Sequence, residues 1–267
     1  MFWVRFRSSI ILMAIAIATI LLGGNVMFAV VLAISLIGLM ELYRVLGIHK
    51  SILGVLGYAA AVGYDLLIYF GREDLRFELL VIFMLVLLGA YVLRFPKYTA
   101  DQLTMTFFGL MYVAVMLSYL YRIRILEDGL VLIWLVFIGS WGSDTCAYCV
   151  GIKFGKHKAT PKLSPKKTVE GCVGGVVGAA LLGLLYGSLF REQLAALFNP
   201  AVACMLICAA SAVISQIGDL AASAIKRNHN IKDYGKLIPG HGGIMDRFDS
   251  VIVTAPIVYL LAVLMKI

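Results

Sequence analysis

Long apolar blocks separated by short polar stretches run through the whole chain. A helix needs about 20 mostly apolar residues to cross the hydrocarbon core of a bilayer, and most blocks approach that length. The pattern therefore predicts nine membrane-spanning helices, at about residues 10–23, 26–44, 52–70, 77–95, 103–121, 130–152, 171–190, 198–225 and 250–266. Only Gly23, Gly24 and Asn25 separate the first two, and they predict a tight turn.

The composition is that of a membrane protein. Of the 267 residues, 62% are hydrophobic and 14% are charged, and the mean hydropathy is +0.96. So little charge cannot supply the polar shell that a soluble domain of this length needs. Arg5 and Arg7 precede the first apolar block as in a signal peptide, but no soluble domain follows, so we expect an uncleaved first span. The expected fold class is all-α, a polytopic membrane protein with about nine transmembrane helices.

Lysine and arginine are concentrated in alternate connections between the predicted spans. If nine helices cross, 17 of the 23 basic residues fall on the side that holds the N-terminus and the polar loops after the sixth and eighth spans. Basic residues favour the cytosolic side. We therefore expect a multi-pass protein of the inner cell membrane, with its N-terminus and active site at the cytosol and its C-terminus outside. This topology and anionic lipid headgroups explain the net charge of +8 without nucleic acid.

The character of the predicted spans changes near residue 135. Before that point the spans are plainly apolar, and after it lie nearly all the polar residues inside spans. We therefore expect two regions. Residues 1–130 would form an N-terminal scaffold of about five helices, and residues 131–267 a catalytic membrane region of about four helices with two cytosolic motif loops.

Carboxylates inside a membrane span are costly and usually mark a site or a pathway. Asp144 lies nine residues before Lys153 in one span, and Asp219 lies seven residues before Lys226 in another. With a rise of 1.5 Å per residue, both lie roughly 10–14 Å inside the cytosolic end. Two carboxylates at similar depth predict a site for a divalent cation. Asp65, near the outer end of the third span and without an evident partner, is expected to be structural.

Polar residues recur every four positions along the span at 198–225. They are Ser211, Ser215, Asp219, Ser223 and Arg227. This spacing places them on one face of a helix. Serine often forms hydrogen bonds between membrane helices, and that interpretation stays open for the serines. A stripe that contains a carboxylate and ends in basic residues favours a hydrophilic site open to the cytosol.

Two patterns of small residues predict close helix packing. Residues 171–178 contain two overlapping G-x-x-x-G pairs, which let another helix approach closely. Cys146 and Cys149 form a C-x-x-C inside an apolar helix. A metal site there would need two further ligands, and a reactive thiol would need exposure. We expect both cysteines to be small packing residues.

The loop after the sixth span, residues 162–171, is rich in lysine. Thr168 is expected to be the N-cap of the next helix. Lys166 and Lys167 stand just before that helix, where free backbone N–H groups and the helix dipole favour an anion. An ordinary cytosolic loop would have the same composition, so the segment by itself leaves both interpretations open.

The loop after the eighth span, residues 232–249, combines glycines, carboxylates and basic residues. Glycines around His241 allow the backbone to approach a ligand closely. Asp246 and Asp249 are three residues apart, so a helical turn would place both on one face. Arg247 between them can bind phosphate. Carboxylates for a hard cation beside basic residues are typical of phosphoryl or nucleotidyl transfer. Soluble nucleotide motifs such as G-x-x-x-x-G-K-[ST] do not occur in the sequence.

Residues 223–249 resemble the signature of the bacterial phosphatidate cytidylyltransferases, also called CDP-diacylglycerol synthases. The matching residues are Ser223, Lys226, Arg227, Lys232, Asp233, Gly235, Pro239, His241, Gly242, Gly243, Asp246, Arg247 and Asp249. Residues 164–171 and the stretch around Asp144 also look like blocks of this family. The resemblance covers roughly residues 135–255, and the first five spans match only in being apolar.

The resemblance implies a nucleotidyltransferase that makes CDP-diacylglycerol and pyrophosphate from CTP and phosphatidic acid, with Mg²⁺ required and a second cation left open. Asp219 and Asp246 would bind the metal, with Asp144 and Asp249 as further candidates. The residues expected to bind phosphates or substrates are Lys166, Lys167, Lys226, Arg227, Arg247, Ser223, Gly242, Gly243 and His241. The expected partners are these substrates and membrane lipids, with no nucleic acid; a homodimer is left open.

Two other functions remain open at this stage. A CTP-dependent polyprenol or phytol kinase could use a similar site but would release CDP instead of pyrophosphate. A cation-coupled transporter would also need Asp144 and Asp219 inside the bilayer. It would have little use for the lysine-rich loop, and matching broken helices in two halves of the chain are not evident.

Overall fold

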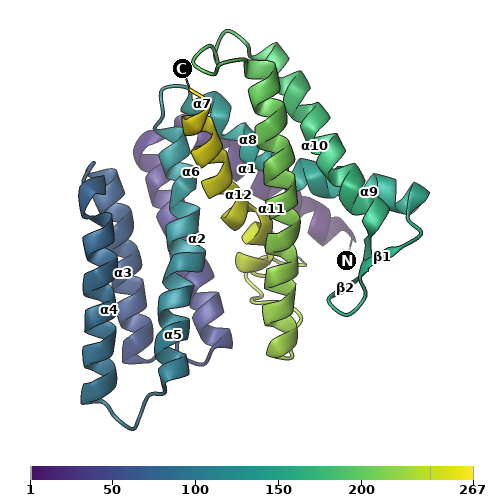
Figure 1. Cartoon of the computed structure of the whole chain (residues 1–267). Helices are drawn as coiled ribbons and strands as arrows, with labels where there is room; N and C mark the ends of the chain where they lie inside the picture. The colour runs from purple at the N-terminus through teal and green to yellow at the C-terminus, as the bar shows by residue number, and fades with distance from the viewer. Residues whose placement is uncertain (1, 241, 267) are drawn as a thin grey trace. The chain divides into compact units, whose positions relative to one another are not determined.

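The computed structural model describes residues 2–240 and 242–266, most of them in helices (Figure 1). The α-helices are α1 (Phe2–Leu22), α2 (Gly24–Val45), α3 (Ile52–Tyr69), α4 (Arg76–Leu93), α5 (Ala100–Gly109), α6 (Met116–Arg124), α7 (Gly129–Leu132), α8 (Trp134–Phe137), α9 (Ser143–Phe154), α10 (Val169–Leu189), α11 (Pro200–Asn228) and α12 (Met245–Leu264). The remaining elements are the 3₁₀ turn η1 (Glu73–Leu75), the π-helical stretches η2 (Leu110–Val115) and η3 (Ile138–Gly142), and the strands β1 (Lys158–Thr160) and β2 (Ser164–Thr168).

Eight helical segments among the described residues are long and apolar enough to cross a membrane. They are Gly24–Val45, Ile52–Tyr69, Glu73–Leu93, Ala100–Arg124, Gly129–Phe154, Val169–Leu189, Pro200–Asn228 and Met245–Leu264. They correspond to the last eight predicted spans. The first predicted span is helical as well: the apolar part of α1, Ile10–Leu22, matches the predicted residues 10–23 and is shorter than the other eight segments.

The chain divides into two compact units. The first contains the chain up to Tyr121 together with Asp233–Asp246, which is most of the loop that carries the signature residues. The second contains Arg122–Lys232 and the chain from Arg247 onward. A segment from the C-terminal half of the sequence therefore packs with the N-terminal helices.

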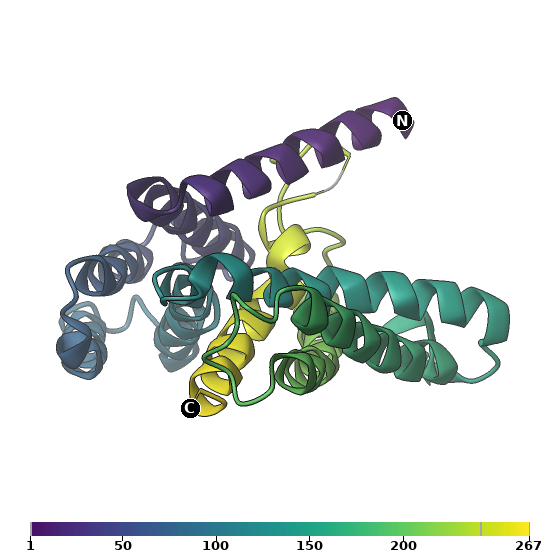
Figure 2. The same cartoon turned by 90° about the horizontal axis from the view of Figure 1, so that it is seen from above.

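Helix α2 organises the first unit by packing against α1, α3 and α5. Tyr43 near its end is fully buried, and its hydroxyl donates a hydrogen bond to the carbonyl oxygen of Thr106 at 2.6 Å. The turn between α1 and α2 is tight, as predicted, with positive φ values of 60° at Gly23 and 46° at Gly24. Figure 2 shows α1 side-on where α3 and α4 are seen nearly end-on, so α1 runs at a steep angle to them.

In the second unit, α10 packs against both α9 and α11, and Figure 1 shows α10 and α11 side by side. Glycines make both approaches close. A Cβ at Gly171 or Gly175 would collide with α9, and a Cβ at Gly183 or Gly187 would collide with α11. The close packing that the G-x-x-x-G pairs predict is therefore confirmed.

The lysine-rich loop contains a short hairpin, a departure from the all-α prediction. β1 pairs antiparallel with β2, with Lys158 opposite Thr168 and Thr160 opposite Ser164. Backbone N–H and C=O groups between two helices need partners, and a short ladder supplies them. The hairpin holds the lysines in a defined arrangement at the start of α10.

The span predicted at 130–152 is one helical segment but not a regular helix. It consists of α7, α8, η3 and α9 in succession. In η3, the hydroxyl of Ser140 bonds back to the carbonyl oxygen of Val136 at 2.7 Å, and Gly139 lies directly against Ser211 of α11. A π-helical stretch changes the direction in which all later side chains point. It therefore sets the orientation of α9 and of Asp144 in its first turn.

Candidate active site

Three carboxylates come together in the second unit. Asp144 lies in the first turn of α9, Asp219 lies in α11, and Asp249 lies near the start of α12. Each of Asp144 and Asp249 lies close enough to Asp219 to repel it electrostatically. Asp249 is buried, Asp219 is partly exposed and Asp144 is exposed. The prediction that Asp144 and Asp219 face a common site is therefore supported by their proximity, and Asp249 joins them.

Lys167 brings positive charge to this group. Its Nζ forms an ion pair with Oδ2 of Asp219, and the two side chains are 23% and 27% exposed. Lys167 also acts electrostatically on Asp144. The lysine-rich loop thus belongs to the same site as the polar stripe of α11. The interpretation of this loop as only a cytosolic connection does not account for the pair.

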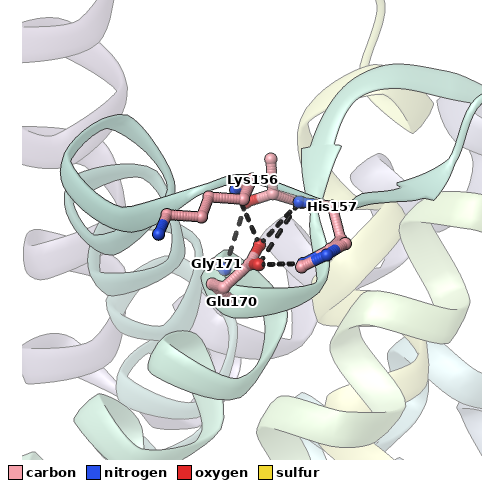
Figure 3. A network of polar contacts seen from close by, with 5 residues as sticks. Lys156, His157, Glu170 and Gly171 are labelled. Carbon is pink, nitrogen blue, oxygen red and sulfur yellow. Dashed lines mark hydrogen bonds and ion pairs between the residues drawn. The ribbon is translucent and has the colours of Figure 1, made fainter.

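The hairpin that carries Lys167 is anchored at the N-terminus of α10 (Figure 3). The carboxylate of Glu170 accepts hydrogen bonds from the backbone N–H groups of Lys156, at 3.1 Å, and of His157, at 3.2 Å. It also lies 2.6 Å from Nδ1 of His157. The hydroxyl of Thr168 accepts from the N–H of Gly171 at 3.1 Å, which confirms its predicted role as N-cap. Lys166, beside Lys167, is exposed.

Backbone contacts to Asp246 shape the signature loop, Asp233–Asp246, in the first unit. Oδ2 of Asp246 accepts hydrogen bonds from the N–H groups of Tyr234, at 2.8 Å, and Gly243, at 3.0 Å. The N–H of Ile238 bonds to the carbonyl oxygen of Gly242 at 2.8 Å and closes the tip of the loop. Gly242 has a φ of 89°, which favours glycine over other residues. His241, predicted to contact a substrate, lies outside the described residues.

Helix α12 begins at Met245, five residues before the predicted start. Asp246, Arg247 and Asp249 interrupt the apolar pattern, so the pattern does not reveal the first turn of the helix. Asp246 and Asp249 therefore lie in its first turns, as the three-residue spacing predicts, with the exposed Arg247 between them.

The C-terminal end of α11 carries two of the basic residues predicted to bind phosphates, Lys226 and Arg227. Ser223 and Lys226 are half-buried and Arg227 is exposed, all within the last two turns of the helix. Lys226 acts electrostatically on Asp249. The helix end thus places positive charge close to the carboxylates, where a polyanionic substrate would need it.

Ser211 and Ser215 of the stripe are completely buried, and neither hydroxyl has a hydrogen-bond partner among residues 2–240 and 242–266. The alternative that these serines hydrogen-bond neighbouring helices is therefore not supported. A buried hydroxyl without a partner costs about 1–3 kcal/mol. Water or a polar ligand that reaches the stripe would recover this energy.

The carboxylate oxygens are of the type that binds a divalent cation. In the described parts of the chain, no three His, Cys, Asp or Glu side chains are already arranged as metal ligands. Asp144, Asp219 and Asp249 nevertheless repel one another, and oxygen ligands of this kind are those that Mg²⁺ prefers. The C-x-x-C offers no alternative site. A Cβ at Gly178 would collide with Cys146, which therefore packs as predicted, whereas Cys149 is exposed.

Two residues near the motifs escaped the sequence analysis. Glu170 lies within the lysine-rich loop, and its anchoring contacts come from residues 13 and 14 positions earlier in the chain. Glu41, in a helix interpreted as scaffold, is 2% exposed and accepts a hydrogen bond from the N–H of Met245 at 2.9 Å. A carboxylate in an otherwise apolar span was the signal that could have identified Glu41.

A model of the cytidylyltransferase family matches residues 3–265. The chain belongs to this family. A phosphatidate cytidylyltransferase of Bacillus subtilis is 33% identical to it over 190 residues, which cover 71% of this chain and 69% of the relative. The phosphatidate cytidylyltransferase of Staphylococcus saprophyticus is 32% identical over 266 residues, 97% of this chain and 98% of the relative. That of Staphylococcus haemolyticus is 31% identical over 266 residues, 98% and 99% of the two chains.

The family predicted from residues 223–249 is thus confirmed. The similarity is not limited to residues 135–255 but covers nearly the whole chain. As a cytidylyltransferase, the protein is a nucleotidyltransferase. The transporter alternative is wrong.

Proposed function

We propose that this cytidylyltransferase transfers the cytidylyl group of CTP to phosphatidic acid at the cytosolic face of the membrane and releases pyrophosphate. The observation that carries the proposal is the pairing of Lys167 on β2 with Asp219, beside Asp144 and Asp249; the three carboxylates lie in helical segments long enough to cross a bilayer. A site for anionic groups and a cation inside such helices suits a substrate whose phosphate is water-soluble and whose acyl chains are not. Full-length relatives named phosphatidate cytidylyltransferase support this substrate.

The reaction joins two polyanions. A phosphate oxygen of phosphatidic acid attacks the α-phosphorus of CTP, the new P–O bond forms, and the bond from the α-phosphorus to the bridging oxygen of the β-phosphate breaks. The attacking phosphate is already anionic, so no strong general base is needed. The protein must align the reactants and stabilise the charge that develops on pyrophosphate.

Basic side chains from two elements would do this work. In the second unit, Lys167 on β2 and Lys226 on α11 lie close to the carboxylates. We assign them to phosphate groups, with Lys166, Arg227 and Arg247 as further ligands. Ser223, Gly242, Gly243 and His241 are assigned to substrate contacts.

Asp219 and Asp246 would hold Mg²⁺, with Asp144 and Asp249 as further ligands. A second cation could share these carboxylates. Oδ2 of Asp246 accepts two backbone hydrogen bonds, which fix the orientation of this carboxylate in the loop. The metal supplies positive charge that neutralises the phosphates and the leaving pyrophosphate.

One assay separates this proposal from the lipid kinase alternative. The protein in detergent is incubated with Mg²⁺, phosphatidic acid and CTP labelled at the α- or the γ-phosphate. We expect α-label in the lipid, γ-label in pyrophosphate, and no reaction after chelation of the metal. A second reaction replaces phosphatidic acid with a polyprenol. Transfer of the γ-label to the polyprenol with release of CDP would establish the kinase, and no product with phosphatidic acid would refute the proposal.

A further inference from the structure

Glu41 is a buried carboxylate near the end of α2, a helix whose one other charged residue is Arg44, three positions later. Burial of a carboxylate is strongly unfavourable unless hydrogen bonds replace its hydration. A helix with only a scaffold role would be more stable with an apolar residue at this position. The partners of Glu41 therefore indicate what the carboxylate does.

Those partners belong to the signature loop, in the same compact unit. The carboxylate accepts the N–H of Met245 at 2.9 Å, and the N–H of Ile244 also bonds to it. Gly235 and Gly243 press against the same carboxylate from two points of the loop, so that a Cβ at either position would collide with it. Glu41 thus contacts both the beginning and the end of the loop.

The side chain of Met245, whose N–H bonds to Glu41, also packs against α2. Met245 is fully buried, and its Sδ would lie 3.5 Å from a Cβ built at Gly38, one turn before Glu41. The loop is held from α1 as well, because the hydroxyl of Ser8 donates a hydrogen bond to the carbonyl oxygen of Pro239 at 3.1 Å. The N-terminal helices therefore form the support on which the loop rests.

The residues that contact Glu41 also contact Asp246, a proposed metal ligand. Gly243, which presses on Glu41, donates its N–H to Oδ2 of Asp246 at 3.0 Å. Met245, which is bonded to Glu41, precedes Asp246 in the chain. A change at Glu41 would move the backbone on both sides of the contacts that orient the Asp246 carboxylate.

We propose that Glu41 is a positioning residue of the cytidylyl transfer reaction, which holds the signature loop Asp233–Asp246 in the conformation that orients Asp246. This role rests on the proposed function of the loop. It assigns to the N-terminal helices a part in catalysis that their apolar sequence does not suggest.

The test compares Glu41→Gln, Glu41→Ala and the control Asp65→Asn in the full-length protein. Asp65 on α3 is buried to a similar degree, 3% exposed, and its Oδ2 has no hydrogen-bond partner among the described residues. Glutamine has the size of glutamate but only one oxygen to accept hydrogen bonds. A role in packing alone predicts that Glu41→Gln behaves as wild type. A hydrogen-bonding role predicts a loss in Glu41→Gln and a larger loss in Glu41→Ala.

Amide hydrogen exchange is the first readout, because it does not depend on which substrate the enzyme uses. For Glu41→Gln we expect exchange at residues 243–245 to become about tenfold faster or more, with exchange in α10 and α11 unchanged. Asp65→Asn should leave the loop at the wild-type rate. Equal exchange in wild type and Glu41→Gln would overturn the proposal, even if Glu41→Ala fails to fold.

Steady-state kinetics with CTP and phosphatidic acid are the second readout. For Glu41→Gln we expect kcat to fall about tenfold or more and KM for CTP to rise by a smaller factor, because the loop orients Asp246 and contributes substrate contacts while Lys167 and Lys226 outside the loop still hold phosphates. Asp65→Asn should retain wild-type kcat. Wild-type kcat in Glu41→Gln would overturn the catalytic part of the proposal. An inactive wild-type protein would instead refute the proposed function, and the exchange measurement would still decide whether Glu41 holds the loop.

Discussion

At the scale of single residues, the ion pair of Lys167 and Asp219 links the hairpin to the polar stripe. The two side chains are partly exposed but Nζ of Lys167 is buried, and the lost hydration of a buried ion pair offsets much of its attraction. The ion pair therefore contributes little to the stability of the fold, and stability does not explain why these residues are paired. Its position beside Asp144 and Asp249 is better explained by phosphate and cation binding.

Lys167→Ala should accordingly lower activity much more than stability. We expect kcat/KM for CTP to fall about 100-fold because a charged contact to a phosphate is lost, while the protein remains folded at the assay temperature. Initial rates and thermal unfolding measure the two effects. The matched control is Lys158→Ala, which removes an exposed lysine of the same hairpin and should keep nearly full activity. Equal losses in both variants would remove Lys167 from the site.

Asp246 combines two tasks that substitutions can separate. Asp246→Asn keeps a side-chain oxygen that can accept the N–H groups of Tyr234 and Gly243, so the loop should persist while turnover is abolished. Asp246→Ala removes the acceptor as well and should lower the unfolding free energy by a further ~2 kcal/mol. Turnover and thermal unfolding of both variants test this. Appreciable activity in Asp246→Asn would exclude Asp246 as a metal ligand.

At the scale of elements, the N-terminus of α10 connects helix packing to the proposed active site. Glycines on α10 allow it to lie close to α9 and α11, which carry Asp144 and Asp219. Thr168 and Glu170 fasten the β1–β2 hairpin to the same helix end. The lysine-bearing strand is thereby held at a fixed place relative to two of the three carboxylates in its unit.

Loss of the Thr168 cap should loosen this attachment. Thr168→Val has the same shape but no hydroxyl for the N–H of Gly171, so we expect a loss of about 1 kcal/mol in stability. KM for CTP should rise as well, because Lys167 is one residue away. Thr168→Ser, which keeps the hydroxyl, is the control and should resemble wild type in both measurements. A Thr168→Val enzyme with unchanged KM would show that the cap does not position the lysines.

At the scale of the whole molecule, topology decides which compartment reaches the site. The excess of basic residues, 17 of 23, on the side of both motif loops supports a cytosolic site. Within the first unit, the hydrogen bond from Ser8 to Pro239 keeps the N-terminal part of α1 beside the signature loop. We propose that α1 crosses the membrane as a ninth span, which places the N-terminus on the cytosolic side and the C-terminus outside.

Reporter fusions test this topology. Alkaline phosphatase attached after the last residue should be active, and a green fluorescent protein in the same place should stay dark, because only the phosphatase matures outside. The same reporters inserted at Lys236 in the signature loop should give the opposite result. A fluorescent C-terminal fusion would contradict the assignment.

Much of the fold and part of the site could be read from the sequence, because they depend on local chemistry. Span length, the N-cap at Thr168 and the tight turn at Gly23 each follow from a few neighbouring residues, and the structure has all three. The signature at 223–249 identified the family. The helix predicted at residues 10–23 is present as well, and its apolar stretch is shorter than the other eight segments.

Only the tertiary structure decided which of these residues meet. The pairing of Lys167 with Asp219 and the support that Glu41 gives to Met245 join residues far apart in the chain. Such contacts depend on how each helix is rotated about its axis. The π-helical stretch η3 changes the rotation of α9 and of Asp144, and the spacing of apolar residues in the sequence does not reveal this change. The sequence by itself thus determined the membrane helices, the family and the chemical types at the site. Packing decided their partners, because contact between distant residues is a property of the assembled helices and not of any one segment.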